Sequence, residues 1–299
     1  MTLQQLKYVV TVAECGNITE AAKQLFVSQP TVTSAIHDLE KEMQIVIFIR
    51  TNKGVILSED GERFLGHARQ VLEQVELIEG IYKDDVVSKP HFAVSCQHYS
   101  FAVNAFVDVI REFDAYQYDF TIREEQTHEI IEDVTNLKSE LGVIYLSSKN
   151  TEVLSKMLKR NELEFTELFT ATPHVFICDS HPLASKNSIT MDDLQDYPYL
   201  TYEQGEYNSQ YFSEEFVSTL DSRKNIRVRD RATLFNLIIG LNGYTVCSGV
   251  ISAELNGRNI ISKPLDVEEY MRIGIISRKG VVLSRYAREY IEALKAHCM

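Results

Sequence analysis

Two helix signals open the chain. Apolar residues at helical spacing predict a helix from Leu3 to about Cys15, and Gly16 follows it as a stop signal. Asn17 is then placed to cap a second helix, with Glu20 three residues later as the reciprocal partner of a capping box. The start of the chain therefore predicts two short helices joined by a tight turn.

A third helix follows, and its two faces differ in character. Ser28 can cap it, and Pro30 lies in its first turn, where no intrahelical N–H is needed. Val32, Ile36 and Leu39 share one face, which we expect to be buried, while polar residues occupy the opposite face. This pattern is typical of a helix-turn-helix whose second helix enters the major groove of DNA. It is also typical of a three-helix packing module with a solvated polar face, so periodicity leaves both interpretations open.

A short hairpin is predicted after the third helix. The apolar stretch 45–48 is followed by Arg50, by the turn Asn52-Lys53-Gly54 and by a second apolar stretch, 55–57. Two short apolar segments around a glycine-containing turn are typical of a β-hairpin. Next to a helix-turn-helix, such a hairpin would be its wing.

Residues 58–88 predict one long helix with a heptad seam. Its apolar side chains recur at alternating spacings of four and three residues: Phe64, Ala68, Val71, Val75, Ile78 and Tyr82. A seam of this kind brings two helices together, so we expect dimerisation through this helix. The alternative is that the same face packs on the helix's own domain.

The pattern changes to that of an α/β domain from His91 onward. Here β-rich apolar runs alternate with amphipathic helices, beginning with an expected strand over His91–Cys96 and a helix over Tyr99–Phe113. Pro90 disfavours helix in the residue before it, which sets the expected boundary near Val86–Pro90.

Charge is distributed unevenly along the chain, whose formal net charge is −13. Residues 1–57 carry five basic and five acidic side chains, whereas residues 58–88 carry three and eight. The acidity therefore lies outside the first segment, and composition permits contact with DNA phosphates without indicating it.

Targeting signals and metal motifs add nothing to this picture. No signal peptide is visible at the N-terminus, and no apolar run approaches the ~20 residues needed to cross a bilayer, so we expect a cytoplasmic protein with no membrane partner. The five cysteines are scattered without CxxC or Cys/His spacing. We expect free thiols, no metal site and no cofactor.

The first segment resembles the DNA-binding domain of LysR-type transcriptional regulators. The motifs that carry this resemblance are Ala21-Ala22, Ser28-Gln29-Pro30, Leu39-Glu40, Phe48-Ile49-Arg50 and Ser58-Glu59-Asp60-Gly61. The resemblance implies double-stranded DNA as a partner, with the following contact residues: Gln29, Pro30, Thr31, Thr33, Ser34, His37, Arg50 and Lys53. Many family members carry Arg or Gln where this chain has Ser34, Ala35 and His37. With fewer long donors, specificity would depend more on DNA shape and on contacts to thymine methyl groups.

The resemblance also implies an α/β multidomain architecture. Residues 1–57 would form the winged helix-turn-helix, 58–88 the linker and dimerisation helix, and 89–299 an effector domain like a periplasmic solute-binding protein. We expect a homodimer through the linker helix, a homotetramer from a second kind of contact, and RNA polymerase as a further candidate partner.

Two subdomains are expected within the effector domain. The first would comprise residues 91–165 and 265–299, and the second residues 166–264. Crossovers between them are expected near Leu163–Glu167 and Ser262–Asp266.

Candidate effector contacts lie where predicted strands end at the cleft between subdomains. They are Gln97, His98, Tyr99, Ser100, Thr201, Glu203 and Ser248. The segment that opens a helix at Ser100 favours an anionic group, and Glu203 across the cleft would suit the cationic end of an amino acid. We therefore expect a small-molecule effector linked to amino-acid or sulfur metabolism. The alternatives are that Glu203 is solvated loop surface and that His98 is a hydrogen-bonded structural histidine.

Other functions find less support in the residues. No nucleophile, base and metal set suggests an enzyme, and no glycine-rich phosphate loop is present. A solute-binding protein would match residues 91–299 but not the helix-turn-helix. A thiol-based redox-sensing regulator of the same family is the main rival; Cys178 and Cys247 are far apart in sequence but could be neighbours in space.

Overall fold

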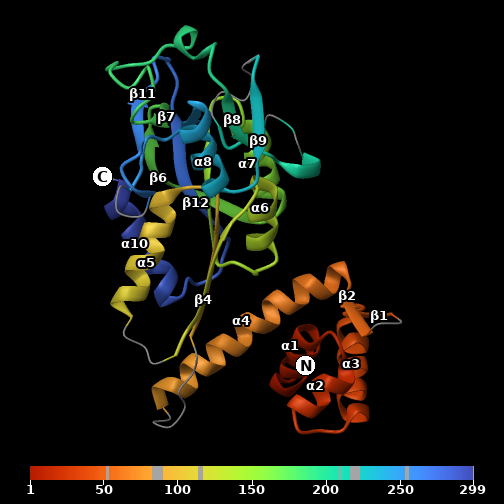
Figure 1. Cartoon of the computed structure of the whole chain (residues 1–299). Coiled ribbons are helices and arrows are strands. Elements are labelled where there is room, and N and C mark those ends of the chain that lie inside the picture. The colour runs from red at the N-terminus through yellow and green to blue at the C-terminus, as the bar shows by residue number, and fades with distance from the viewer. Residues whose placement is uncertain are drawn as a thin grey trace. The chain divides into compact units, whose positions relative to one another are not determined.

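The structure is a computed structural model that describes residues 1–51, 54–82, 90–113, 117–207, 209, 211–215, 223–252 and 256–298. It divides into two compact units, Met1–Pro90 with Asn136–Lys138, and His91–Thr135 with Ser139–Met299 (Figure 1). Over the described ranges, no helix is both long enough and apolar enough to cross a membrane.

The first unit contains the predicted helices, hairpin and linker helix. Its elements are α1 Leu3–Cys15, α2 Ile18–Gln24, α3 Gln29–Met43, β1 Phe48–Thr51, β2 Gly54–Leu57 and α4 Glu59–Tyr82. Strands β1 and β2 pair antiparallel, with Arg50 opposite Val55. The winged helix-turn-helix predicted from the sequence is therefore confirmed, whereas residues 83–88 of the predicted linker lie outside the described residues.

Local capping explains where these helices start and stop. Gly16 ends α1 with a left-handed φ of 61°, and the Asn17 side chain accepts hydrogen bonds from the amides of Thr19 and Glu20 at 2.8 and 3.2 Å. The expected return bond from Glu20 is replaced by an ion pair with Lys23 at 3.1 Å. Only one half of the predicted capping box is formed, because the carboxylate finds a stronger charged partner within its own helix.

The wing is tied to α3 by the motif Leu39-Glu40. Leu39 is buried in the core between the helices, together with Val32 and Ile36. The next side chain, Glu40, accepts hydrogen bonds from the backbone amides of Ile47 and Phe48 at 2.7 and 3.1 Å. One residue therefore packs the recognition-type helix while its neighbour holds the start of the wing.

The second unit alternates strands and helices as expected. Its elements are β3 His91–Cys96, α5 Ser100–Glu112, β4 Asp119–Glu124, α6 Thr127–Thr135, β5 Leu141–Leu146, α7 Thr151–Arg160, β6 Leu163–Ala171, β7 His174–Cys178, β8 Tyr199–Tyr202, β9 Asn225–Val228, α8 Arg231–Leu241, β10 Thr245–Cys247, β11 Ile260–Pro264, β12 Met271–Arg278 and α10 Arg285–Cys298, with single 3-10 turns at Asp192–Leu194 and Gly205–Tyr207.

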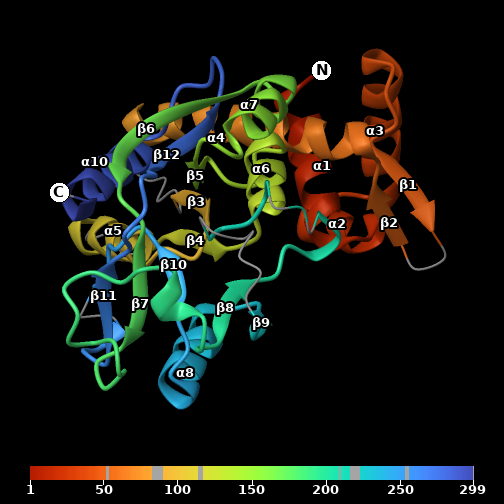
Figure 2. The ribbon, with the colours of Figure 1, turned by 90° about the horizontal axis from the view of Figure 1, so that it is seen from above.

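Five strands form the larger sheet in the order β4-β3-β5-β12-β6. Helices α5 and α10 cover one face and α6 and α7 the other (Figure 2). Strand β5 explains why both faces can be covered, because all six of its residues are buried. Val143 and Tyr145 pack into the core that contains α5 and α10, whereas Ile144 and Leu146 pack with α6 and α7. Such a two-sided strand is typical of α/β sheets.

A smaller sheet with the order β10-β7-β11 and the parallel pair β8-β9 form the second subdomain, and α8 packs against them. The first crossover lies later than the sequence predicts. Residues 163–171 pair with β12 in the larger sheet, so the chain leaves the first subdomain after Ala171 and not near Leu163–Glu167. The apolar pattern of β6 would suit a strand of either sheet. Only the pairing with β12 determines that β6 belongs to the first subdomain.

Glu40 yields a prediction about stability. Replacing it by Ala leaves the Ile47 and Phe48 amides without their acceptor, and we expect the free energy of unfolding to fall by about 1–3 kcal/mol. Glu40→Gln keeps an oxygen acceptor and should lose less. Urea unfolding of the full chain measures both, with the exposed neighbour change Lys41→Ala as the control. Equal stabilities of Glu40→Ala and Lys41→Ala would contradict this role.

Candidate functional site

The polar face of α3 is the candidate DNA-binding surface. Gln29, Pro30, Thr31, Ser34 and His37 are all exposed, on the helix that buries Val32, Ile36 and Leu39 on its other side. The His37 side chain is 75% exposed and has only a 4.0 Å approach to Asp38. The helix therefore exposes a row of polar and small side chains, of which the Thr31 hydroxyl already shares a hydrogen bond of 2.7 Å with Ser28.

Thr33 differs from its neighbours on this helix. It is half-buried, and its hydroxyl oxygen is buried with no hydrogen-bond partner. A base contact by this hydroxyl would need the side chain to turn outward, so Thr33 is less suited to DNA contact than the sequence suggests.

Arg50 on β1 extends the candidate surface to the wing. It is exposed, and among the described residues it has no ion-pair partner, which leaves its charge available to a phosphate. Lys53, the other expected wing contact, lies outside the described residues. The wing hairpin thus contributes one free arginine beside the polar face of α3.

The predicted seam of α4 has two parts. Phe64 packs against the core of the DNA-binding domain, and Ala68 is 2% exposed. Val71 and Ile78 are 40% and 58% exposed, with Val75 half-buried between them. The alternative reading, packing on its own domain, therefore holds for the start of the helix, and the apolar surface free for a second helix begins at Val71. Tyr82 is the last residue of α4.

A pocket lies in the second unit, between the larger sheet's β3–α5 connection and the second subdomain. His98, Tyr99 and Ser100 come from that connection, Tyr202 from the end of β8, and the remaining lining residues are Phe176, Glu214, Glu215, Arg231, Phe235, Thr245, Val246, Cys247, Ser248 and Val250. A water-sized sphere can enter about 40 Å³ of this space, which is room for a few water molecules. A ligand larger than this would have to widen the cleft.

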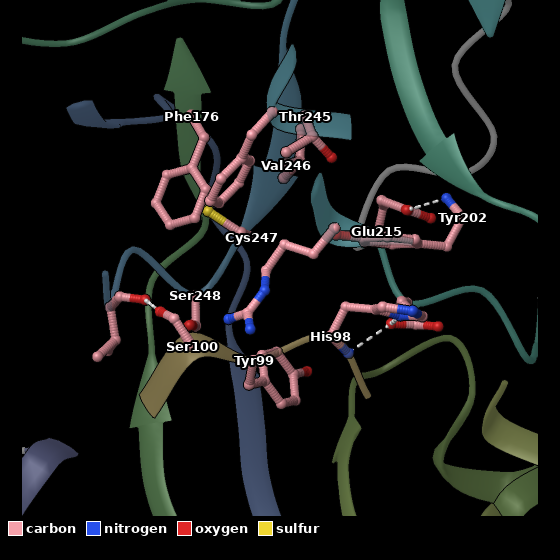
Figure 3. A pocket seen from close by; sticks show the side chains of 14 residues that line it. His98, Tyr99, Ser100, Phe176, Tyr202, Glu215, Thr245, Val246, Cys247 and Ser248 are labelled. Carbon is pink, nitrogen blue, oxygen red and sulfur yellow. Dashed lines mark hydrogen bonds and ion pairs between the residues drawn. The ribbon is translucent and has the colours of Figure 1, made fainter. Parts of the chain in front are cut away.

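Figure 3 shows where the polar side chains of the pocket lie. Ser100 and Ser248 lie on one side of the pocket, and the rings of His98 and Tyr202 lie on the other. These two rings stack, with centroids 3.8 Å apart and an interplanar angle of 6°. Ser100 donates a long hydrogen bond of 3.4 Å to the Val250 carbonyl. Groups from both subdomains therefore face the same space.

Two ion pairs cross this cleft. His98 Nδ1 lies 2.8 Å from Glu214, whose carboxylate also accepts from the His98 amide at 3.0 Å. Arg231, the first residue of α8, lies 2.9 Å from Glu124 at the end of β4. Burial lowers the pKa of His98, but the charge and hydrogen bond of Glu214 outweigh it and raise the pKa overall. Because His98 Nε2 lies 3.1 Å from the Arg229 carbonyl, both ring nitrogens face acceptors, which favours the protonated ring.

Four of the seven expected effector contacts line the pocket, namely His98, Tyr99, Ser100 and Ser248. Gln97 does not: it is 1% exposed, and its side chain bonds to Thr127, to the Tyr145 amide and to the Tyr99 hydroxyl. Glu203 is paired with Arg229 instead. Neither side chain is therefore available in the pocket.

Thr201 also lies outside the lining, because strand alternation turns its neighbour Tyr202 toward the pocket. Sequence reasoning missed Glu214, Arg231 and Thr245. The first lies in an irregular segment with no periodic signal. Arg231 had a signal, since Asp230 caps α8 and places the following residue at the helix start, where the cleft lies.

The cysteine pair considered as a redox switch is not close in space. Cys247 lies opposite His174 in the β10–β7 pairing, and Cys178 lies four residues further along β7. At about 3.3 Å per residue, the two are roughly 13 Å apart, beyond the Cα separation of a disulfide. Burial also raises the pKa of the Cys247 thiol, which disfavours the reactive thiolate. All five cysteines are free.

A winged helix-turn-helix and a two-subdomain α/β unit with a pocket in its cleft define the class: a DNA-binding domain joined to an effector-binding domain. Residues 3–62 match the family described as "Bacterial regulatory helix-turn-helix protein, lysR family", and residues 94–299 match "LysR substrate binding domain". The chain belongs to the LysR family and is a DNA-binding transcriptional regulator with an effector-binding domain. The resemblance inferred from the sequence is confirmed.

Similar proteins match this chain over nearly its whole length. The uncharacterized HTH-type transcriptional regulator YvbU of Bacillus subtilis is 28% identical, over 99% of this chain and 98% of its own length. The DNA-binding transcriptional dual regulator OxyR of Escherichia coli is 22% identical over 99% and 95%. A structure of full-length OxyR from Pseudomonas aeruginosa is 21% identical and superimposes with a TM-score of 0.64 over 99% of this chain and 98% of that one. At this identity the likeness shows the fold alone.

Glu215 is the most perturbed carboxyl of the pocket. Burial is the main cause, and the charge of Glu214 adds to it, so that the pKa of Glu215 rises from 4.5 to about 8. Hydrogen bonds from the Tyr202 amide at 2.6 Å and the Ser213 hydroxyl at 3.0 Å only partly offset these effects. This pKa favours the protonated carboxyl in the folded protein at neutral pH.

This perturbed pKa predicts a pH dependence of stability. Between about pH 4.5 and 8 the unfolded chain releases the Glu215 proton while the folded chain retains it. The free energy of unfolding therefore falls as pH rises through this window, by roughly 1 kcal/mol per pH unit from this group. Glu215→Gln, which cannot ionise, should remove that part of the slope.

The measurement is urea unfolding of both proteins at several pH values between 5 and 8.5. The difference between them isolates Glu215 from His98 and every other titrating group. Parallel curves for the two proteins would mean that Glu215 ionises normally in the folded state.

Proposed function

We propose that this regulator binds operator DNA as a dimer joined through α4, and that a small molecule in the cleft of its effector domain changes that binding. The observation that supports DNA contact most directly is the division of α3 into a buried apolar face and an exposed polar face. The proposed base contacts are Gln29, Pro30, Thr31, Ser34 and His37, with Thr33 secondary because its hydroxyl is buried. Arg50 and Lys53 are the proposed phosphate contacts.

The composition of the pocket supports the effector role. Its walls come from both subdomains, so a ligand that touches both would stabilise the closed cleft over the open one. His98, Tyr99, Ser100 and Ser248 remain proposed contacts, and an effector from amino-acid or sulfur metabolism remains a prediction. The thiol-based alternative finds no support in the separation of Cys178 and Cys247.

Phosphate contacts and base contacts should differ in how strongly they depend on the DNA sequence. Arg50→Ala should weaken binding to specific and random duplexes alike and reduce the slope of log K against log salt by about 1, because a phosphate contact is independent of sequence. His37→Ala should instead narrow the gap between specific and random affinity by roughly 1–3 kcal/mol if the ring contacts a base edge.

Fluorescence anisotropy can measure both variants, with an operator selected from random DNA by the unaltered protein. Lys7→Ala, an exposed lysine of α1, is the control for loss of one positive charge. If His37→Ala weakens every duplex equally, α3 is not the helix that reads the bases.

The proposed dimer depends on the exposed part of the seam. Val71→Glu together with Ile78→Glu places like charges where two α4 helices would meet, and we expect a monomer with at least tenfold weaker operator binding. Light scattering and gel shift measure this. Gln74→Glu, which adds a charge at an exposed position outside the seam, should leave the dimer intact. An unchanged mass for the double variant would place the dimer contact elsewhere.

A further inference from the structure

Two buried polar atoms of the pocket have no hydrogen-bond partner among the residues that the structure describes. Arg231 Nη1 is buried and unpaired, while Nη2 of the same guanidinium is engaged with Glu124. Thr245 is 4% exposed, and its hydroxyl oxygen is also buried and unpaired. Both residues line the cavity. Leaving a donor buried and unsatisfied is costly, so two of them in one cavity indicate a ligand that supplies acceptors.

The carboxylates of the wall, by contrast, are already used. Glu214 accepts from His98 and from the Gln204 amide group at 3.2 Å. Glu215 accepts from the Tyr202 amide and from the Ser213 hydroxyl. Glu124 forms an ion pair with Arg231 but is not among the lining residues, and its Oε1 makes no hydrogen bond to the described residues. Both carboxylates that do line the cavity, Glu214 and Glu215, therefore already have partners, which argues against the zwitterion expected from the sequence.

The start of α5 adds a further preference for negative charge. Ser100 is its first residue, and the N-cap residue Tyr99 provides no side-chain acceptor for the first-turn amides. Such a helix start favours an anion. The ion pairs His98–Glu214 and Arg231–Glu124 leave the wall close to neutral, so a single negative charge is better accommodated than two.

Part of the remaining lining is apolar. Phe176 and Phe235 meet edge-to-face with centroids 6.4 Å apart, and Val246 and Val250 also line the cavity. These side chains offer nothing to the hydration shell of an inorganic ion, but they suit a hydrocarbon body. The cavity therefore combines a donor site for one anionic group with an apolar wall.

We propose that the pocket binds a small organic monocarboxylate, whose carboxylate is held by Arg231 and Thr245 and whose apolar body lies against Phe176 and Phe235. This proposal rests on the proposed function in one respect: both place the ligand in this pocket. It names the chemistry of the ligand and makes no claim about the ligand's effect on DNA binding. Arg231 and Thr245 are then specificity-determining residues: they select an anion over an amine, an amide or an amino acid.

A panel built on one carbon skeleton tests the charge preference. Isovalerate, its amino acid valine, isovaleramide and isopentylamine are titrated into the full-length protein at pH 7 by calorimetry, with acetate, benzoate and sulfate as size and class controls. We expect saturable binding of isovalerate or benzoate, at least about tenfold weaker binding of the amide, the amine and valine, and no competition by sulfate.

Two variants locate the binding. Thr245→Val removes only a hydroxyl that has no partner, so it should fold as the parent does and bind the acid about tenfold more weakly. Arg231→Gln should reduce binding at least as much. Arg229→Gln changes an arginine two residues away that is paired with Glu203 outside the cavity, and it should bind normally.

The outcomes separate the two proposals. Equal binding of amide, amine or valine, full binding of the acid to both variants, or failure of every acid to bind overturns the carboxylate assignment and leaves the effector role to be judged on DNA binding. An acid that binds through Arg231 without changing operator affinity keeps the assignment and counts against the effector role.

Discussion

The effector domain depends on the two ion pairs that cross its cleft. His98 and Glu214 are each 4% exposed, so neither charge could remain there without the other. Arg231 and Glu124 are also largely buried, and they join the start of α8 to the end of β4. Because Arg231 and Glu124 belong to different subdomains, opening the cleft would separate this pair of buried charges. The pocket between them is thus held closed by electrostatics as well as by packing.

The segment that supplies Glu214 has no regular structure of its own, and the larger sheet's subdomain fixes it by hydrogen bonds. The Thr127 amide donates to Gln204 at 3.2 Å, the Thr127 hydroxyl donates to the Phe212 carbonyl at 2.8 Å, and Tyr145 donates to the Ser213 carbonyl at 3.1 Å. Its partners are buried and on rigid elements, so an irregular loop can present charges as accurately as a helix would.

Sequence reasoning succeeded where the signal is local and failed where it is not. Caps at Asn17 and Ser28 and the stop at Gly16 act within a few residues, which is why the helices of the first unit begin and end where predicted. Whether β6 belongs to one sheet or the other depends on a partner strand a hundred residues away. The predictions that Gln97 and Glu203 contact the effector failed for the same reason. Each residue does lie at the end of a strand, but its side chain is already bonded to residues distant in sequence.

The comparison with OxyR illustrates how far a shared fold reaches. This chain shares its fold with a full-length OxyR structure. Its cysteines Cys178 and Cys247 lie on neighbouring strands too far apart to join, and the thiol of Cys247 is buried. What the pocket leaves unsatisfied is a guanidinium nitrogen and a hydroxyl, not a thiolate. A fold fixes where a cleft lies, whereas the groups left without partners in that cleft determine what it can recognise. In this regulator those groups are a guanidinium N–H, which can only donate, and a hydroxyl, which can donate to a carboxylate. The proposed recognition of an acid therefore follows from Arg231 and Thr245 and not from the fold that the chain shares with its relatives.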